Sequence, residues 1–151
     1  MEIKIDVNID ADKLTKQFEA LKDDNVMYEI HDLFAKMCDP YVPMAEGMLA
    51  QSVNLGISMS SITYYGPYAH YMYVGEVYGP NIPIIEDGIV VGWFSPPGQK
   101  KQPTGREIQY NKEYHPLASK EWDKAMMRDK GDEFLKAVAD ILLQRCKELY
   151  G

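Results

Sequence analysis

The chain has 151 residues, and its 16 basic and 23 acidic side chains give a net charge of −7. One domain is expected for this length, and the acidic balance argues against general nucleic-acid binding, which depends on Lys and Arg. No apolar run approaches the roughly 18 residues of a membrane span, and the first residues lack the apolar stretch of a signal peptide. We therefore expect one globular domain, made in the cytosol and kept there or in an assembly formed there.

The first third of the chain predicts a strand followed by helix. Apolar and polar residues alternate over residues 2–9, which is typical of a half-buried strand. Apolar residues then recur at helical spacing over residues 14–21 and again over residues 26–37. The charged segment between the two patterns separates two helices or bends one long helix. Pro40 and Pro43 are expected to end the helical region, because proline lacks the amide donor and restricts the residue before it.

The middle of the chain returns to a period of two. Gly47-Met48-Leu49 is interpreted as a turn that feeds a strand, since apolar residues then alternate over residues 53–64. Residues 68–74 fit either one helical turn or a strand. Gly47 and Gly75 are expected to serve backbone geometry.

Residues 82–93 contain the clearest hairpin signal. Asp87-Gly88 separates two apolar runs, and this pair favours a type I′ turn. Pro83 places its strand at a sheet edge or at a strand start. Residues 95–105 follow as a Pro- and Gly-rich segment with Lys100 and Lys101, and they are predicted to be a flexible loop that either connects elements or orders on a partner.

The last third predicts a C-terminal helix. A helical pattern that includes Trp122, Ala125 and Met126 is interrupted at Gly131. An apolar stripe then runs from Phe134 to Leu149, and we expect this face to lie on a sheet. Cys38 and Cys146 are expected to be buried free thiols, with a disulfide left open. The whole chain predicts a single α+β domain over residues 1–151: a small antiparallel sheet with a long hairpin, packed against a straight or kinked N-terminal helix and a C-terminal helix.

No residue pattern indicates catalysis, a cofactor or a metal. His31, His70 and His115 lie far apart in the sequence, without Cys or carboxylate at ligand spacing. No nucleophile elbow or phosphate-binding glycine motif is present. Two weak alternatives stay open: a thiol–imidazole pair of Cys38 with His70, and an acid/base pair of His70 with Glu76. We expect a protein that is not an enzyme.

Tyrosine is the unusual component of the chain. Seven of the 11 Tyr lie between positions 41 and 78. Tyr joins an apolar ring to a polar hydroxyl, so the cluster fits either a half-exposed sheet face or an interface. A third alternative is a single-stranded nucleic-acid-binding module, in which the cluster from Tyr64 to Tyr73 stacks bases and nearby basic residues hold phosphates. The aromatic stretch itself has no Lys or Arg, which weakens that alternative.

Four segments, taken in order, resemble a family of tailed-phage proteins. The segments are Tyr41-Val42-Pro43 at the end of a helix, Gly47-Met48-Leu49-Ala50-Gln51-Ser52, Tyr68-Ala69-His70-Tyr71, and His115-Pro116-Leu117 followed by Trp122-Asp123-Lys124-Ala125-Met126. Their order over residues 25–145 is similar to that in the minor capsid and head–tail connector proteins of the tail-completion group. The pair Gly75-Glu76 departs from the family, since many members carry Gly-Thr there.

The resemblance implies a structural virion protein and not an enzyme. Such proteins form a homo-oligomeric ring in the neck of the particle, between the portal-side connector and the tail-tube proteins. Packaged DNA passes through the ring without specific binding, and the acidic charge suits such a channel. By this reading the protein is assembled in the host cytoplasm and ends in the virion, without membrane contact. The interface residues we expect are Tyr68, Tyr71, Tyr73, Lys100 and Lys101.

Overall fold

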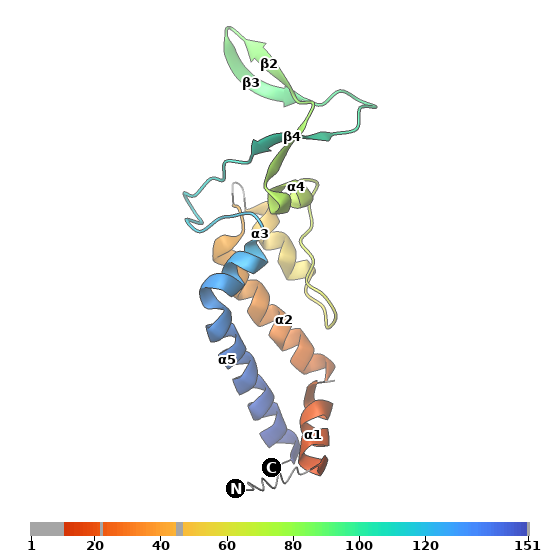
Figure 1. Cartoon of the computed structure of the whole chain (residues 1–151). Helices are drawn as coiled ribbons and strands as arrows, with labels where there is room; N and C mark the ends of the chain where they lie inside the picture. Colours follow the sequence, from red (N-terminus) through yellow and green to blue (C-terminus); the bar gives the residue numbers. More distant parts are fainter. Residues whose placement is uncertain (1–10, 22, 45–46, 151) are drawn as a thin grey trace, which may run out of the picture.

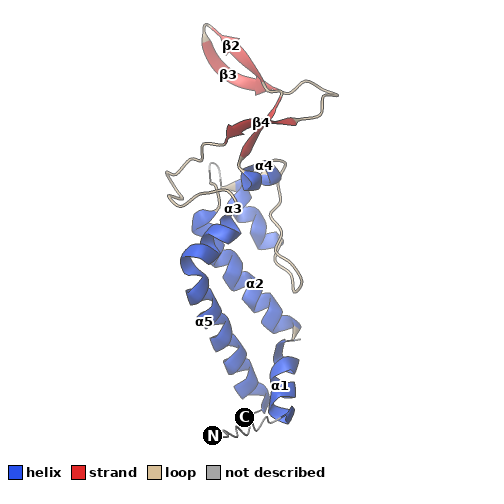
Figure 2. Ribbon diagram, in the orientation of Figure 1, coloured by secondary structure: helices blue, strands red, loops and turns tan. Residues whose placement is uncertain are grey.

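The computed structural model describes residues 11–21, 23–44 and 47–150. Helices α1 (Ala11–Leu21), α2 (Asp24–Cys38) and α5 (Trp122–Tyr150) form an elongated body, and a β-structured extension leads away from its upper end (Figure 1). The strand predicted at residues 2–9 lies outside the described residues. The α+β class is confirmed, with helices and strands occupying separate parts of the molecule (Figure 2).

The break between the first two helical patterns is a helix boundary. Asp23 is the N-cap of α2, and its carboxylate accepts hydrogen bonds from the N–H groups of Asn25 and Val26 at 2.9 and 3.4 Å. An acidic N-cap satisfies amides that have no partner within the helix. Helix α2 ends at Cys38, and Pro40 lies in the short 3-10 helix η1 (Asp39–Tyr41), so the predicted end of the helical region is confirmed.

The strand predicted over residues 53–64 is wrong. Gly47 adopts a left-handed backbone, with φ +78°, and leads into helix α3 (Met48–Ser52) and the 3-10 helix η2 (Val53–Leu55). The alternation misled because Val53 is buried while Leu55 is exposed on the same helical turn. Only an isolated bridge between Ile57 and Ile62 has strand character in this segment.

The ambiguous segment after the tyrosine-rich turn is helix α4 (Ala69–Val74). Gly75 ends it with φ +79°, a conformation that glycine adopts without steric cost. Strand β1 (Glu76–Gly79) follows and pairs antiparallel with β4 (Gln102–Glu107). The segment predicted as a loop over residues 95–105 is therefore a loop only in its first part, because its last residues pair with β1.

The predicted hairpin is confirmed. Strands β2 (Ile82–Glu86) and β3 (Ile89–Phe94) pair antiparallel. Asp87 and Gly88 both have positive φ, at 50° and 78°, as a type I′ turn requires. The two two-stranded ribbons β1–β4 and β2–β3 are separate sheets, and the hairpin projects beyond the helices (Figure 1).

Helix α5 lies on helices and not on a sheet, contrary to the sequence expectation. It packs against α1 and α2, and the rings of Phe34 and Phe134 meet edge to face at 5.2 Å. Lys130 has non-helical angles, φ −131° and ψ 17°, which places a kink beside Gly131 as the pattern predicted. Neighbouring helices cover the apolar stripe of α5. A helical period shows that one face is apolar, but it does not show whether that face packs on helices or on a sheet.

The core lies where the upper ends of α2 and α5 meet α3 and α4. Trp122 is at its centre, with the ring of Tyr64 at 5.1 Å and that of Tyr73 at 5.0 Å, both edge to face. Both cysteines are free thiols, but only Cys38 is buried as expected, whereas Cys146 near the end of α5 is half-buried. The buried core residues are Cys38, Tyr41, Val42, Ala50, Trp122, Ala125 and Met126. This core holds α4 firmly on the helical body, so the β extension starts from a fixed base.

Candidate interaction surface

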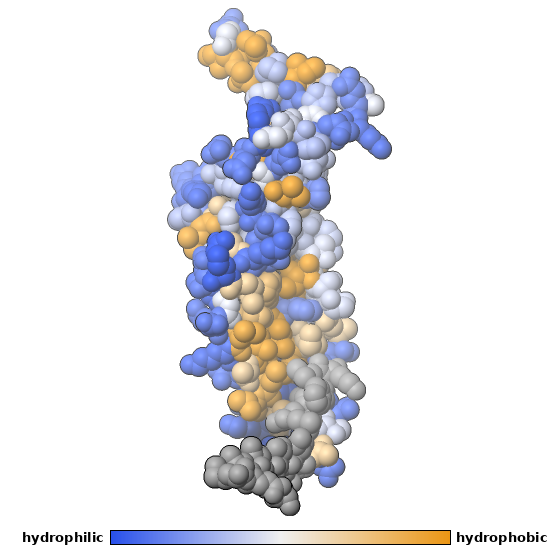
Figure 3. Space-filling view, in the orientation of Figure 1, coloured by the Kyte–Doolittle hydropathy of each residue, from blue (hydrophilic) through white to orange (hydrophobic). Residues whose placement is uncertain are grey.

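Among the residues that the structure describes, the hairpin β2–β3 carries the largest set of exposed apolar side chains. Each strand finds its main packing partner in the other strand, and apolar side chains gather over the hairpin at the top of the space-filling view (Figure 3). The exposed residues are Ile82, Ile84, Ile85, Ile89, Val90, Val91, Trp93 and Phe94. Contiguous apolar surface of this kind marks an interaction site in a folded protein.

Both faces of the hairpin are apolar. Residues directly opposite one another in an antiparallel pair share a face. The pair Ile82–Phe94 and the side chain of Ile84 therefore lie on one face, while the pairs Pro83–Trp93 and Ile85–Val90 lie on the other. A ribbon that is apolar on both faces is typical of a strand pair covered on both sides. The isolated chain provides no such cover within its described residues.

A second apolar surface lies on the helical body. It is a groove of about 660 Å³ between α3, α4 and the turn that joins Tyr65 to Tyr68. The residues that line it are Pro43, Gly47, Met48, Leu49, Ser52, Tyr65, Gly66, Pro67, Tyr68, Ala69 and Met72. None of these described lining residues carries a charge. The groove therefore suits apolar side chains better than a charged ligand.

The Gly47-to-Ser52 segment shapes this groove. Gly47 adopts the left-handed backbone that starts α3. Ser52 Oγ donates a hydrogen bond to the carbonyl of Leu49 at 2.6 Å and accepts one from the N–H of Tyr65 at 2.9 Å. These two bonds fix the tyrosine-rich turn against α3. The backbone conformation at Gly47 and the hydrogen bonds of Ser52 therefore shape the groove within the single chain.

The three tyrosines predicted as interface residues occupy different environments. Tyr68 is exposed and lines the groove. Tyr71 is half-buried, and its ring lies 4.8 Å from that of Tyr78. Tyr73 packs on the core, and its hydroxyl donates to Asp123 at 2.9 Å. Burial and this bond raise the pKa of Tyr73. Tyr73 therefore stabilises this chain, and we retain only Tyr68 and Tyr71 as interface candidates.

The two lysines predicted as interface residues lie in the loop before β4, away from the groove. Lys100 is exposed. Lys101 is half-buried, and its ammonium group donates to Asn81 Oδ1 at 3.1 Å. Ser95 donates to the same oxygen at 3.1 Å, so Asn81 ties the loop down at both of its ends. Of the two lysines, Lys100 is therefore the one that is exposed to solvent.

Only part of the tyrosine cluster is exposed for the stacking that a nucleic-acid-binding module would need. Tyr64 packs on Trp122, and burial raises the pKa of its hydroxyl far above the usual range. Tyr73 is held by the core as well. Only Tyr65 and Tyr68 of the five rings between Tyr64 and Tyr73 are exposed, and the described groove lining beside them has no Lys or Arg to hold a phosphate.

Neither of the weak enzymatic pairings finds support in the geometry. Cys38 is buried, and burial together with the nearby charge of Asp123 raises the pKa of its thiol to about 12. A thiol in this state is not nucleophilic at neutral pH. His70 is exposed and lies against the rings of Tyr71 and Tyr78, while Glu76 accepts a hydrogen bond from the Gly105 amide at 2.9 Å.

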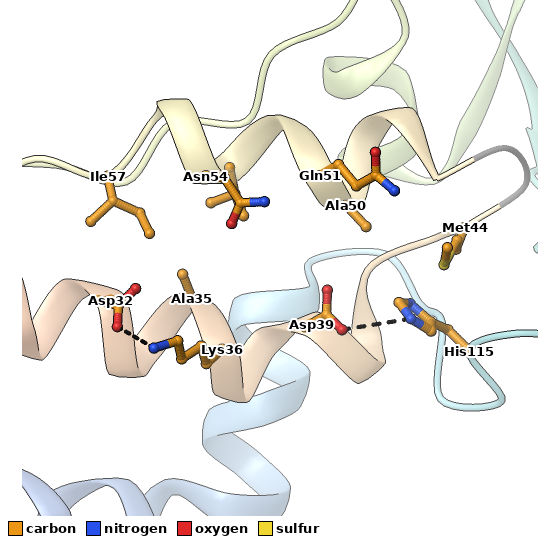
Figure 4. Close-up of a pocket in the computed structure, with 11 residues that line it drawn as sticks. Asp32, Ala35, Lys36, Asp39, Met44, Ala50, Gln51, Asn54, Ile57 and His115 are labelled. Carbon is orange, nitrogen blue, oxygen red and sulfur yellow. Dashed lines mark hydrogen bonds and ion pairs between the residues drawn. The ribbon is translucent and has the colours of Figure 1, made fainter.

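A more polar groove of about 400 Å³ lies between α2 and α3. On its α2 side, Asp32 pairs with Lys36 at 2.6 Å, and at the end of α2 Asp39 points toward His115 at 3.6 Å (Figure 4). His115 Nδ1 donates to the carbonyl of Val42 at 2.8 Å, because a carbonyl oxygen only accepts. The ring therefore anchors the segment before α5 to the end of α2, which is a structural role.

No three His, Cys, Asp or Glu side chains among the described residues are grouped closely enough to hold a metal ion. Within the same part of the chain, no helix combines the length and the apolar character needed to cross a bilayer.

No protein-family model matches the chain, and no curated protein or solved structure is significantly similar to it. The features of the chain that bear on its function are the apolar hairpin and the apolar groove. Sequence reasoning identified the hairpin but missed its role as a surface. The signal was present, because Ile84-Ile85 and Ile89-Val90-Val91 are continuous apolar runs where a half-exposed strand would alternate.

Proposed function

We propose that the chain is a structural virion protein of a tailed phage or prophage, a tail-completion or connector subunit in the neck between head and tail. The observation that carries this proposal is the hairpin, which is apolar on both faces and is supported at the end of a rigid helical body. The apolar faces of such a hairpin are covered only when a partner packs against them in an assembly. The sequence resemblance over residues 25–145 supplies the kind of assembly.

The proposed setting is a homo-oligomeric ring between the portal-side connector and the tail-tube proteins. Each ring subunit offers two different surfaces to its two neighbours, and the hairpin and the groove are two such surfaces. The net charge of −7 suits a channel through which DNA passes without binding. On this proposal the protein is not an enzyme, and it is assembled in the host cytoplasm into the virion.

The test is electron microscopy of particles made when the gene is silenced in its phage or prophage. We expect DNA-filled heads and detached tails, because the neck cannot be completed without this subunit. A plasmid copy of the wild-type gene should restore joined particles, which controls for effects on neighbouring genes. Normal infectious virions in the silenced culture would refute the proposed function.

A further inference from the structure

We infer that the hairpin β2–β3 of one copy docks in the apolar groove between α3 and α4 of a second copy, so that copies join head to tail. This contact would be the subunit contact of the proposed ring, and it rests on the proposed function for its biological place. The association itself is a property of the purified chain and is tested on that chain alone.

The apolar area of the hairpin is large enough to drive association. An aromatic side chain buries roughly 150–250 Å², so the exposed fractions of 63% for Trp93 and 48% for Phe94 leave roughly 200 Å² open. Six exposed Ile and Val side chains add to this area. A stable interface buries about 800 Å² on each partner. The hairpin therefore supplies a large share of one side of such an interface.

The groove has the complementary character. Its described lining is apolar and uncharged, and Met48 and Tyr68 are exposed at its edge. Its volume of about 660 Å³ accommodates a few large side chains but no folded partner. The projecting hairpin can insert a few large side chains of this kind, among them Trp93 on one of its faces. The groove is also held open in the single chain by the hydrogen bonds of Ser52.

Charge disfavours an anionic membrane as the partner of the hairpin. The turn of the hairpin carries Glu86 and Asp87, which an anionic lipid surface repels. Two copies of a chain with net charge −7 also repel each other at long range. Added salt screens that repulsion while leaving apolar contact intact, so the proposed association should become stronger at higher salt.

The proposed contact joins two different surfaces of the chain. The hairpin projects from the β extension, whereas the groove lies on the helical body, so the two surfaces are distinct. Copies joined in this way form a ring if the rotation closes and an open chain if it does not. A dimer made by two hairpins pairing with each other would instead use the same surface twice.

The experiment uses one variant at each surface of the full chain. Trp93→Asp places a charge on the hairpin, and Met48→Asp places one at the edge of the groove. Both positions are exposed, so neither change should disturb the fold, and circular dichroism checks this. Sedimentation velocity over a concentration series measures association. A buried Trp at an interface centre predicts that Trp93→Asp raises the dissociation constant at least about thirtyfold.

Mixing the two variants gives the decisive result. Each variant alone should be monomeric, but an equimolar mixture should form a 1:1 dimer and nothing larger, because one intact hairpin and one intact groove remain. Leu143→Asp, at a site 55% exposed on α5, is the matched control and should associate like the wild type. Tyr68→Ala should weaken association as a second groove variant.

Several outcomes would overturn the inference. Wild-type chain that stays monomeric at roughly 1 mM lacks even the weak affinity of about 4 kcal/mol that the contact requires. A mixture of variants that stays monomeric, or a Met48→Asp variant that associates normally, would show that the hairpin meets another surface. Detached tails in the silenced phage together with any of these results would leave the proposed function standing and remove only this contact.

Discussion

Asp23 shows how one side chain can join two distant parts of the chain. One carboxylate oxygen caps α2, and the other accepts a hydrogen bond from Arg145 Nε of α5 at 3.1 Å. Arg145 is the largest cause of a lowered pKa for Asp23. The pair ties the lower end of α5 to the boundary between α1 and α2, far from the core around Trp122.

Replacing Asp23 with Asn should make thermal stability less dependent on pH in acid. The folded pKa of Asp23 is below its ordinary value of about 3.9, so its stabilising effect is present above that value and is lost as pH falls through the folded pKa. Asn preserves the N-cap. The melting temperature of the variant should lie below that of the wild type at pH 7, and the difference should shrink below about pH 4.

The control for that prediction is Asp24→Asn, in the first turn of the same helix. It should leave the pH dependence of the melting temperature close to that of the wild type. A constant difference between Asp23→Asn and wild type down to the acid limit would contradict the ion pair with Arg145.

At the scale of elements, the turn between η2 and the tyrosine-rich segment depends on a close backbone approach. Gly56 is buried, and a Cβ added to it would lie 1.8 Å from the carbonyl oxygen of Thr63. The amide of Thr63 also donates to the carbonyl of Gly56 at 2.9 Å. The segment therefore folds back on itself, which is why alternating residues there do not form a strand.

We expect Gly56→Ala to lower the free energy of unfolding by about 1–3 kcal/mol, the usual cost of forcing extra volume into a packed site. Urea denaturation followed by circular dichroism measures it. Gly92→Ala is the matched control, since the atom nearest to its added Cβ is Ile84 Cδ1 at 3.7 Å, an ordinary contact. Equal stability of the two variants would contradict the close approach at Gly56.

At the scale of the whole molecule, the chain is long and carries the exposed apolar hairpin at one end. Helices α1, α2 and α5 form the body, and the hairpin lies beyond β1 and β4 (Figure 1). A compact chain of 151 residues has a radius of gyration of about 15 Å. The elongated arrangement places the hairpin where a neighbour can reach it without contact between the two helical bodies.

Small-angle scattering should therefore give a radius of gyration clearly above about 15 Å for the monomer. The Trp93→Asp variant is the suitable sample, because the proposed association would otherwise enlarge the measured value. Extrapolation to zero concentration removes any remaining effect. A value near 15 Å would mean that the β extension folds back on the helical body in solution.

The candidate site was predictable only in part. Tyr68 was named from the tyrosine cluster and does lie at the groove, because an exposed Tyr next to a Gly-Pro turn is a local feature. Tyr73 was named for the same reason, yet it is held by Trp122 and Asp123. Sequence spacing cannot distinguish these two roles, since they depend on a partner about 50 positions away.

The sequence by itself determined the local elements: a break or bend between the first two helical patterns, the type I′ turn at Asp87-Gly88, the interruption at Gly131 and the α+β class. These follow from capping, backbone conformation and short-range periodicity, which act within a few residues. Only the tertiary structure decided what each element packs against. It placed α5 on helices, paired the end of the predicted loop with β1, and left the hairpin uncovered, because burial depends on contacts between residues distant in sequence.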